Sequence, residues 1–183
     1  MSQKIPRLEL QALRADLAEY LQPRVKRLGY LGELFKCVGN APGVILTFMH
    51  FTDALKEALP DRLTEVGALT VAGLLKNDYE RNQHERLSVK LGFGEQWVAE
   101  VNRLQPEQAK SMNETERIAQ RYAIAAIKTL GSEVEKEFDA LASVLPPSEA
   151  MAFVMLVGRY VTHALAVNTL KLKPPVPSIF ESE

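Results

Sequence analysis

Apolar residues recur at helical spacing through almost the whole chain, and this periodicity constrains the fold most. One example is a row of four leucines at i, i+3, i+7 and i+11, namely Leu10, Leu13, Leu17 and Leu21. Such spacing places side chains on one face of a helix. No stretch shows the sustained alternation of apolar and polar residues, bounded by turns, that is typical of hairpin strands. We therefore predict an all-α fold.

Start and stop signals divide this pattern into a series of helices. Proline lacks an amide hydrogen, so Pro23 is expected to end the first helix. Asn113 with Glu116, and Ser132 with Glu135, have the spacing of capping boxes, which begin helices. The expected helices cover about residues 10–21, 31–38, 42–59, 61–76, 77–91, 94–101, 114–130, 133–145 and 148–172. The last is apolar around much of its circumference, which predicts a place at the centre of the core.

The length of 183 residues fits a single domain, because domains average roughly 150 residues. We expect an N-terminal helical extension at 1–30, the main domain at 31–172 and an extended, proline-rich tail at 173–183. Prolines exclude a helix in the tail. It either stays free or docks Ile179 and Phe180 on a neighbouring subunit.

Composition and charge exclude several classes of protein. With 46% hydrophobic and 25% charged residues the chain resembles a soluble globular protein, and its net charge of −1 offers no basic excess for nucleic acid or an anionic membrane. The most apolar runs, 66–75 and 151–157, fall short of the roughly 18 residues of a membrane span. No secretory signal is visible, and the single cysteine, Cys37, excludes an intrachain disulfide. We expect a cytoplasmic protein.

Two segments carry candidate catalytic residues. Glu65 is the one ionisable residue between Arg62 and Lys76, and burial of its helix face would raise the pKa of its carboxyl unless a partner holds the charge. Alternatively, it lies in the first helical turn and faces solvent. Glu80 and His84 share a face at i and i+4, where a half-buried imidazole beside carboxylates is expected to have a pKa near neutrality.

Glu80 and His84 also have purely structural interpretations. His84 can be a core histidine whose ring nitrogens are satisfied by hydrogen bonds. Asn77 and Glu80 have capping-box spacing and can begin the helix that carries them. Elsewhere, His50 and His163 lack an accompanying carboxylate in a recognisable motif, so we expect core or interface positions for them.

The order Glu65, Asn77-Asp78-Tyr79-Glu80, His84 resembles the carboxymuconolactone decarboxylase and alkylhydroperoxidase D superfamily, whose peroxidase members carry Glu-x11-Cys-x2-Cys-x3-His. Glu65 and His84 stand at the family's glutamate and histidine. Asn77 and Glu80 stand at its two redox cysteines. The resemblance extends loosely over residues 34–172, and it implies an alkylhydroperoxidase D-like helical bundle that assembles as a homo-oligomer, whether dimer, trimer or hexamer.

The departure from the family pattern bears on the mechanism. A dithiol peroxidase needs a reactive thiolate and a resolving thiol, which Asn77 and Glu80 cannot supply. Cys37 lies some forty residues earlier without a resolving partner, so we assign it a structural role. The superfamily also includes decarboxylases that act on small acidic lactones without metal or organic cofactor, and their chemistry needs only well-placed acids and bases.

We therefore predict that Glu65 and His84 form a buried, hydrogen-bonded pair. His84 would shuttle protons, Glu65 orient it, Glu80 act as a second acid or base, and Tyr79 donate a hydrogen bond. Arg159 and Tyr160 interrupt an apolar run, and they either reach a substrate carboxylate or form a buried ion pair, for instance of Arg159 with Glu65.

A metal bound by Glu65, Glu80 and His84 has weak support, because the set contains only one histidine, and we predict neither metal nor cofactor. The predicted function is cofactor-independent proton transfer or decarboxylation on a small organic acid or lactone. Two alternatives remain: a peroxidase of the alkylhydroperoxidase type that acts on peroxide without the dithiol, and a non-catalytic oligomeric binding protein.

Overall fold

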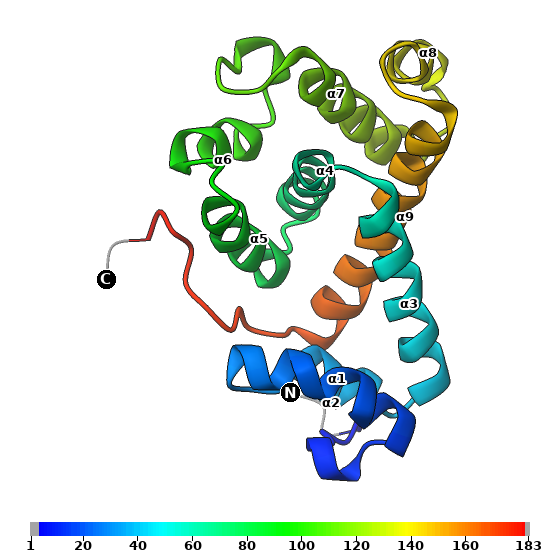
Figure 1. The fold of residues 1–183 in the computed structure, drawn as a ribbon, viewed down its shortest axis with the longest axis vertical. Coiled ribbons are helices and arrows are strands. Elements are labelled where there is room, and N and C mark those ends of the chain that lie inside the picture. The colour runs from blue at the N-terminus through cyan, green and yellow to red at the C-terminus, as the bar shows by residue number, and fades with distance from the viewer. Residues whose placement is uncertain (1–3, 182–183) are drawn as a thin grey trace. The chain divides into compact units, whose positions relative to one another are not determined.

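The structure is a computed structural model that describes residues 4–181, and over this range it contains helices and no strand. The predicted all-α class is confirmed. In chain order the helices are α1 (Ala15–Leu28), α2 (Glu33–Val38), α3 (Pro42–Ala58), α4 (Asp61–Leu74), α5 (Asp78–Lys90), α6 (Glu95–Asn102), α7 (Glu114–Thr129), α8 (Glu135–Val144) and α9 (Pro147–Leu170) (Figure 1). Two short 3-10 turns, Leu10–Ala12 and Pro106–Gln108, complete the described elements.

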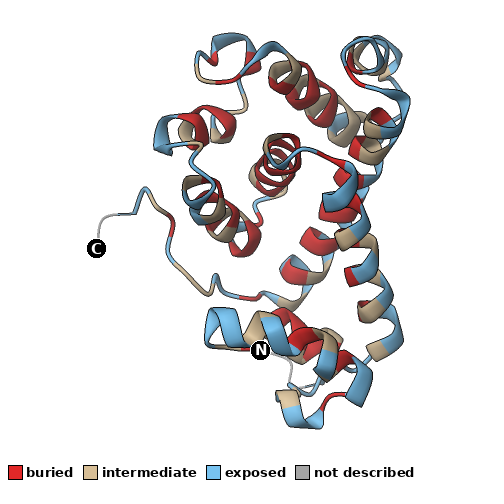
Figure 2. Ribbon diagram, in the orientation of Figure 1, coloured by how far each residue is buried: buried red, intermediate tan, exposed pale blue. Residues whose placement is uncertain are grey.

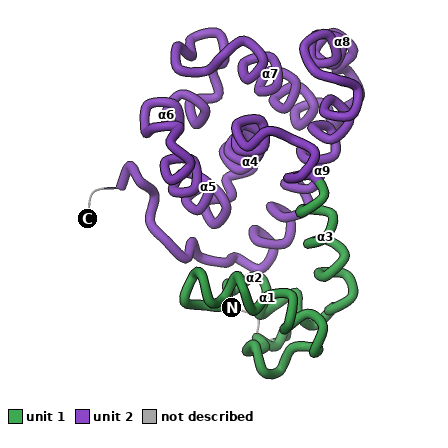
Figure 3. The backbone as a smooth tube through the Cα atoms, viewed as in Figure 1, with its two compact units in different colours: residues 1–54 green, residues 55–183 purple. Residues whose placement is uncertain are grey.

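The chain forms two compact units, residues 1–54 and 55–183 (Figure 3). These units are defined by compactness and do not test the domain boundaries expected above, at residues 30 and 172, which stay a prediction. All residues of the candidate site belong to the second unit, which we describe at greater length.

The core of the first unit contains leucines of the predicted stripe, but only Leu17 and Leu21 lie in α1, which begins at Ala15 and not near residue 10. Leu13, Leu17 and Leu21 are buried together in one apolar cluster. However, Pro23 lies inside α1 and does not end it. The reason is that Val25, beyond the proline, packs against the same cluster, so burial stabilises the helix on both sides of the missing amide donor.

Helix α8 also begins later than expected, because the predicted capping box of Ser132 and Glu135 does not form. The Ser132 hydroxyl donates to the carbonyl of Thr129 at the end of α7, and Val134 precedes the first residue of α8 without a side-chain cap. The box of Asn113 and Glu116 at the start of α7 forms completely. Equal spacing thus led to different outcomes, because the serine has a competing acceptor within reach.

Helix α4 is the central element of the second unit, with α5, α6, α7 and α9 around it (Figure 1). Every residue from 63 to 72 is buried, so α4 is enclosed on all sides (Figure 2). The prediction that the last helix is central was wrong, since α9 packs with one face only and exposes Met151, Met155 and Leu165 on the other.

Helix α9 also passes the length and composition criteria for a membrane span, contrary to the expectation that no segment would. Its best window has a mean hydropathy of 1.6, because averaging tolerates the single Arg159 that interrupts the apolar run. Within this window, 56% of the residues are buried inside the protein. A core helix of a soluble protein meets the same criteria, so α9 is weak evidence for a membrane.

Helices α4 and α9 approach closely at Gly67. A Cβ atom added to Gly67 would lie 2.7 Å from Cδ2 of Leu156 and 3.3 Å from Cε2 of Phe153. Gly73 faces Leu104 in a looser contact. Both glycines of α4 therefore pack against side chains of the same chain.

The C-terminal segment packs on helix α5 of its own chain, so the expectation of a free tail was wrong, whereas docking of Ile179 and Phe180 on a neighbouring subunit stays a prediction. Asn82 and Arg86 donate hydrogen bonds to the carbonyls of Val176 and Pro177, at 3.0 Å each. The buried Glu85 carboxylate accepts from the Ser178 hydroxyl at 2.6 Å. Fixed acceptors and donors on α5 explain why the proline-rich stretch is held without being helical.

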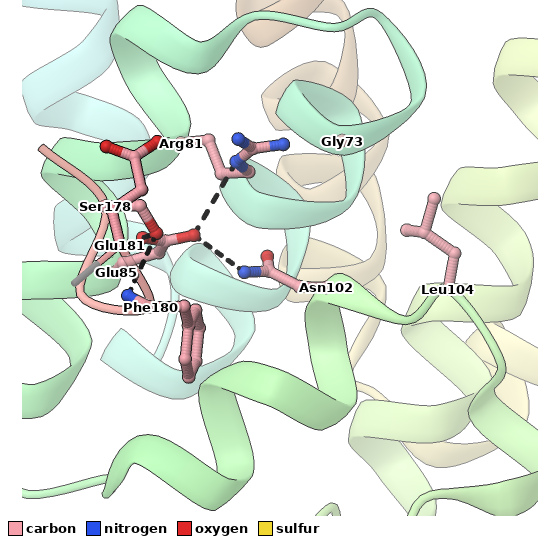
Figure 4. A pocket seen from close by; sticks show the side chains of 8 residues that line it. All are labelled: Gly73, Arg81, Glu85, Asn102, Leu104, Ser178, Phe180 and Glu181. Carbon is pink, nitrogen blue, oxygen red and sulfur yellow. Dashed lines mark hydrogen bonds and ion pairs between the residues drawn. The ribbon is translucent and has the colours of Figure 1, made fainter. Parts of the chain in front are cut away.

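Glu85 also joins this segment to α6, since it accepts a hydrogen bond from Asn102 at 2.8 Å (Figure 4). In addition, it accepts one from the Ile179 backbone amide at 3.1 Å. A pocket of about 380 Å³ lies here, lined in part by Arg81 and Phe180. None of the four predicted catalytic residues lines it.

We predict that Gly67→Ala lowers the free energy of unfolding by about 1–3 kcal/mol, because the new methyl group overpacks the contact with Leu156. Gly158→Ala on α9 is the matched control. No atom lies within 4 Å of a Cβ added there, so the change should stabilise the helix by about 0.5–1 kcal/mol. Urea unfolding measures both values, and equal effects would contradict the close packing of α4 on α9.

We predict that Glu85→Gln loosens the C-terminal segment, because an amide cannot accept from Ser178 and Ile179 as strongly as a carboxylate. Amide hydrogen exchange at Ile179 should accelerate, and stability should fall by about 1–3 kcal/mol. Arg86→Ala, which removes one exposed hydrogen bond to Pro177, should have the smaller effect. Unchanged exchange at Ile179 would show that Glu85 does not hold the segment.

Candidate functional site

Glu65 and His84 form a buried, hydrogen-bonded pair between the neighbouring helices α4 and α5. Nδ1 of His84 lies 2.7 Å from Oε2 of Glu65, and the Ser88 hydroxyl donates to the same oxygen at 3.2 Å. Glu65 is only 2% exposed, so the alternative of a solvent-facing residue in the first turn is wrong. The predicted contact is confirmed, whereas the catalytic roles of these residues stay a prediction.

The second carboxylate, Glu80, is directed into the same cluster. The backbone amide of Glu80 donates to the side-chain oxygen Oδ1 of the N-cap residue Asn77 at 3.2 Å. The backbone amide of Asn77 donates to the carbonyl of Ala72 and not to the Glu80 side chain. Only half of the capping box therefore forms. The Glu80 side chain instead meets two groups of α9, Nη1 of Arg159 at 3.0 Å and Nε2 of His163 at 3.2 Å.

Helix α9 contributes residues that sequence reasoning placed incompletely. Arg159 forms the buried ion pair foreseen as one alternative, but with Glu80 and not with Glu65. His163 is buried as expected, yet it has the carboxylate partner that its local sequence lacks. The i, i+4 spacing of Arg159 and His163 on one helix face is the signal that pairs them. His50, by contrast, is exposed and lies edge-on to Tyr20, so a core position for it was wrong.

Two tyrosines enclose the histidines. Tyr160 lies edge-on to the His84 ring, with its hydroxyl oxygen 3.3 Å from Nε2 of His84. Tyr79 is buried, and its ring centroid lies 6.2 Å from that of His163. Tyr79 is thus placed beside the site, whereas its predicted role as a hydrogen-bond donor to substrate stays untested.

The two carboxylates determine the charge state of His84. Burial would lower the pKa of His84, but the charge and hydrogen bond of Glu65, together with those of Glu80, raise it to about 9. The expectation of a pKa near neutrality was therefore wrong, because the ring is buried between two acids. At neutral pH the structure favours an imidazolium that can donate a proton.

Glu80 has the opposite tendency. Burial would raise the pKa of the Glu80 carboxyl, but the close contact with the His163 ring, the His84 hydrogen bond and the Arg159 charge hold it well below the usual range. Glu80 is therefore ionised at neutral pH. Within residues 4–181, no three His, Cys, Asp or Glu side chains are arranged to hold a metal ion.

Solved structures with the same fold include proteins related to alkylhydroperoxidase. One is the AhpD core of an uncharacterized peroxidase-related protein from Ralstonia eutropha JMP134, with 17% identity and a TM-score of 0.81 over 92% of this chain and 90% of that one. Another is a variant of the debrominase Bmp8 in complex with 2,3,4-tribromopyrrole, with 16% identity and a TM-score of 0.77 over 94% and 92% of the two chains.

A third neighbour is an uncharacterized peroxidase-related protein from Silicibacter sp. TM1040, with 15% identity and a TM-score of 0.77 over 94% of this chain and 93% of that one. No protein-family model matches the sequence, and no curated protein matches it either. The structural likeness establishes that the chain has the helical fold of the AhpD core, and the fold expected from the resemblance is confirmed.

The raised pKa of His84 predicts how stability depends on pH. Its contribution is fully present below about 6.5, the ordinary histidine pKa, and is lost as the pH rises through about 9. Glu65→Gln removes the negative charge that keeps His84 protonated. The free energy of unfolding of the variant should therefore lose its slope against pH and fall by an amount on the order of a few kcal/mol.

Urea unfolding of the wild type and of Glu65→Gln at about pH 6 and about pH 9 measures this difference. Glu19→Gln, at an exposed position, is the control and should keep the wild-type slope. If Glu65→Gln also keeps that slope, Glu65 does not hold the charge of His84.

Proposed function

We propose that this protein is a cofactor-independent enzyme that transfers a proton, with or without decarboxylation, on a small organic acid or lactone. The observation that carries the proposal is the buried contact of 2.7 Å between Nδ1 of His84 and Oε2 of Glu65. It leaves Nε2 of His84 directed toward Tyr160 and Glu80. Such a constellation supports general acid and base chemistry.

Exposure separates the roles of the two residues. The His84 side chain is 9% exposed and that of Glu65 only 3%, so His84 is the member nearer to a substrate. Glu65 orients the ring and stabilises its charge, and Tyr79 donates a hydrogen bond. Because Glu80 is ionised by its neighbours on α9, it serves as a base, which is the one of its two predicted roles open to a carboxylate.

In a decarboxylation, the bond between the carboxylate and its neighbouring carbon breaks, CO2 leaves and the electron pair stays on that carbon. His84 then donates the proton on Nε2 to the carbon, and water returns a proton to the neutral ring. In an isomerisation, Glu80 accepts a proton from one carbon while His84 donates one to another, and the proton on Glu80 then passes to Nε2 of His84, 3.5 Å away. Both reactions need only the acids and bases of this cluster and water.

Peroxide reduction is the competing function, favoured by the peroxidase-related description of two structural neighbours. It requires another route, because Asn77 and Glu80 stand where the resemblance places the cysteines. Cys37 is free but buried at 5% exposure, which limits its access to peroxide. The third candidate, a binding protein without activity, uses the same cluster only to stabilise the core.

We further propose a cytoplasmic homo-oligomer, whether dimer, trimer or hexamer, without a nucleic-acid partner. The exposed apolar face of α9, with Met151, Met155 and Leu165, supports self-association. The net charge of −1 argues against binding to a nucleic-acid backbone.

We predict that His84→Ala lowers kcat by roughly 10²- to 10⁴-fold on the best substrate from a screen of small lactones and keto acids. The loss follows from removal of the proton donor. His50→Ala, which removes an exposed histidine outside the site, is the control and should retain wild-type turnover. Full activity of His84→Ala would exclude the proposed role of His84.

A peroxide-consumption assay of the wild type and Cys37→Ser separates the competing function. Thiol-dependent turnover that disappears in Cys37→Ser would support peroxide reduction and contradict our proposal. If no screened substrate reacts and Glu65→Gln changes only the melting temperature, the binding protein is the better interpretation.

A further inference from the structure

The N-cap of α5 fixes the orientation of an amide group inside the site. Oδ1 of Asn77 accepts the amide hydrogen of Glu80 at 3.2 Å, and a nitrogen in that place would oppose one donor with another. The side-chain nitrogen of Asn77 therefore points the other way, where it lies 3.3 Å from Nδ1 of His163. An amide nitrogen donates only, so Nδ1 of His163 must accept.

This contact determines where His163 carries its proton. With Nδ1 as an acceptor, the ring is neutral and its hydrogen is on Nε2. Nε2 lies 3.2 Å from Oε2 of Glu80, so it donates to that carboxylate. A second proton on Nδ1 would set two donors against each other in a buried place, and the N-cap prevents the amide from turning to relieve the conflict.

The charges of the cluster agree with this arrangement. Two carboxylates, Glu65 and Glu80, face two cationic groups, His84 and Arg159. A neutral His163 leaves these four charges balanced, whereas a cationic His163 would add an unmatched buried charge to them. Tyr79, whose ring packs on His163, and Asn77 are the uncharged groups that face it from the α5 side.

We propose that Asn77 and His163 form a positioning pair: Asn77 keeps His163 neutral with its hydrogen on Nε2, and His163 holds Glu80 in place for His84. The two buried histidines then differ in charge at neutral pH, His84 being an imidazolium. The position of the proton follows from geometry alone, whereas its consequence for turnover rests on the proposed function.

Nitrogen NMR of the full chain with ¹⁵N-labelled histidine tests the position of the proton. The three histidines are assigned with His50→Ala and His163→Gln. In the wild type near neutral pH we expect an imidazolium for His84 and a neutral ring with its hydrogen on Nε2 for His163. An imidazolium at His163, or a neutral ring with its hydrogen on Nδ1, would overturn the proposal.

Asn77→Asp is the sharpest variant, because the carboxylate still accepts from the Glu80 amide but presents an acceptor to Nδ1 of His163. We expect the neutral His163 signal to be replaced by that of an imidazolium. Asn77→Ser keeps a good cap without adding charge but removes the amide donor, so the imidazolium signal of its His163 should lie between those of the wild type and Asn77→Asp. An unchanged His163 in Asn77→Asp would contradict the positioning pair.

Activity distinguishes failure of this proposal from failure of the proposed function. If the wild type turns over a screened substrate, Asn77→Asp should lower kcat with little change in KM and displace the pH profile, because Glu80 is then held by a cationic ring. If no variant or wild type shows turnover, the proposed function fails while the NMR result still decides the position of the proton.

Discussion

Two carboxylates buried on the neighbouring helices α4 and α5 can stay charged only if cations and hydrogen-bond donors reach them, and this requirement governs the centre of the second unit. Glu65 obtains its donors from α5, through His84 and Ser88. Glu80 obtains its donors from α9, through Arg159 and His163. Loss of a charged partner weakens this compensation, and removal of one member of a buried ion pair costs about 3–5 kcal/mol in proteins. The cluster therefore couples α4, α5 and α9 electrostatically as well as by packing.

This coupling favours one of two interpretations of Glu80, namely a member of the buried ion-pair cluster rather than a cap of α5. A carboxylate needed only to cap α5 would bond back to the Asn77 amide, as Glu116 does at the start of α7. The Asn77 amide instead finds a backbone acceptor at Ala72, which leaves the Glu80 side chain available to the cluster. A cap that gives up half of its hydrogen bonds to a buried ion pair indicates that the ion pair is the feature being maintained.

Periodicity predicted the helical class and most helix positions, because the 3.6-residue spacing of buried side chains is a local property. The contact of Glu65 with His84 was predictable because α4 and α5 are consecutive and closely joined. The partners on α9 were not, since Arg159 and His163 are about eighty residues from Glu80 and their meeting depends on how α9 packs. Pro23 and Ser132 were misjudged for a similar reason, because tertiary burial and a competing acceptor override local signals.

The same tertiary contacts change the chemistry that the motif suggests. A histidine beside one carboxylate is a proton shuttle near neutrality, but His84 lies between two carboxylates and is charged there. The two residues that stand where the resemblance places redox cysteines contribute to this charged state of His84. Glu80 is one of the two acids, and Asn77 directs His163 toward Glu80. At these two positions an amide and a carboxylate form a fixed arrangement of charge and hydrogen bonds. Under the proposed function the donor is prepared before the substrate arrives, and a substrate that develops negative charge on carbon is the one it would stabilise.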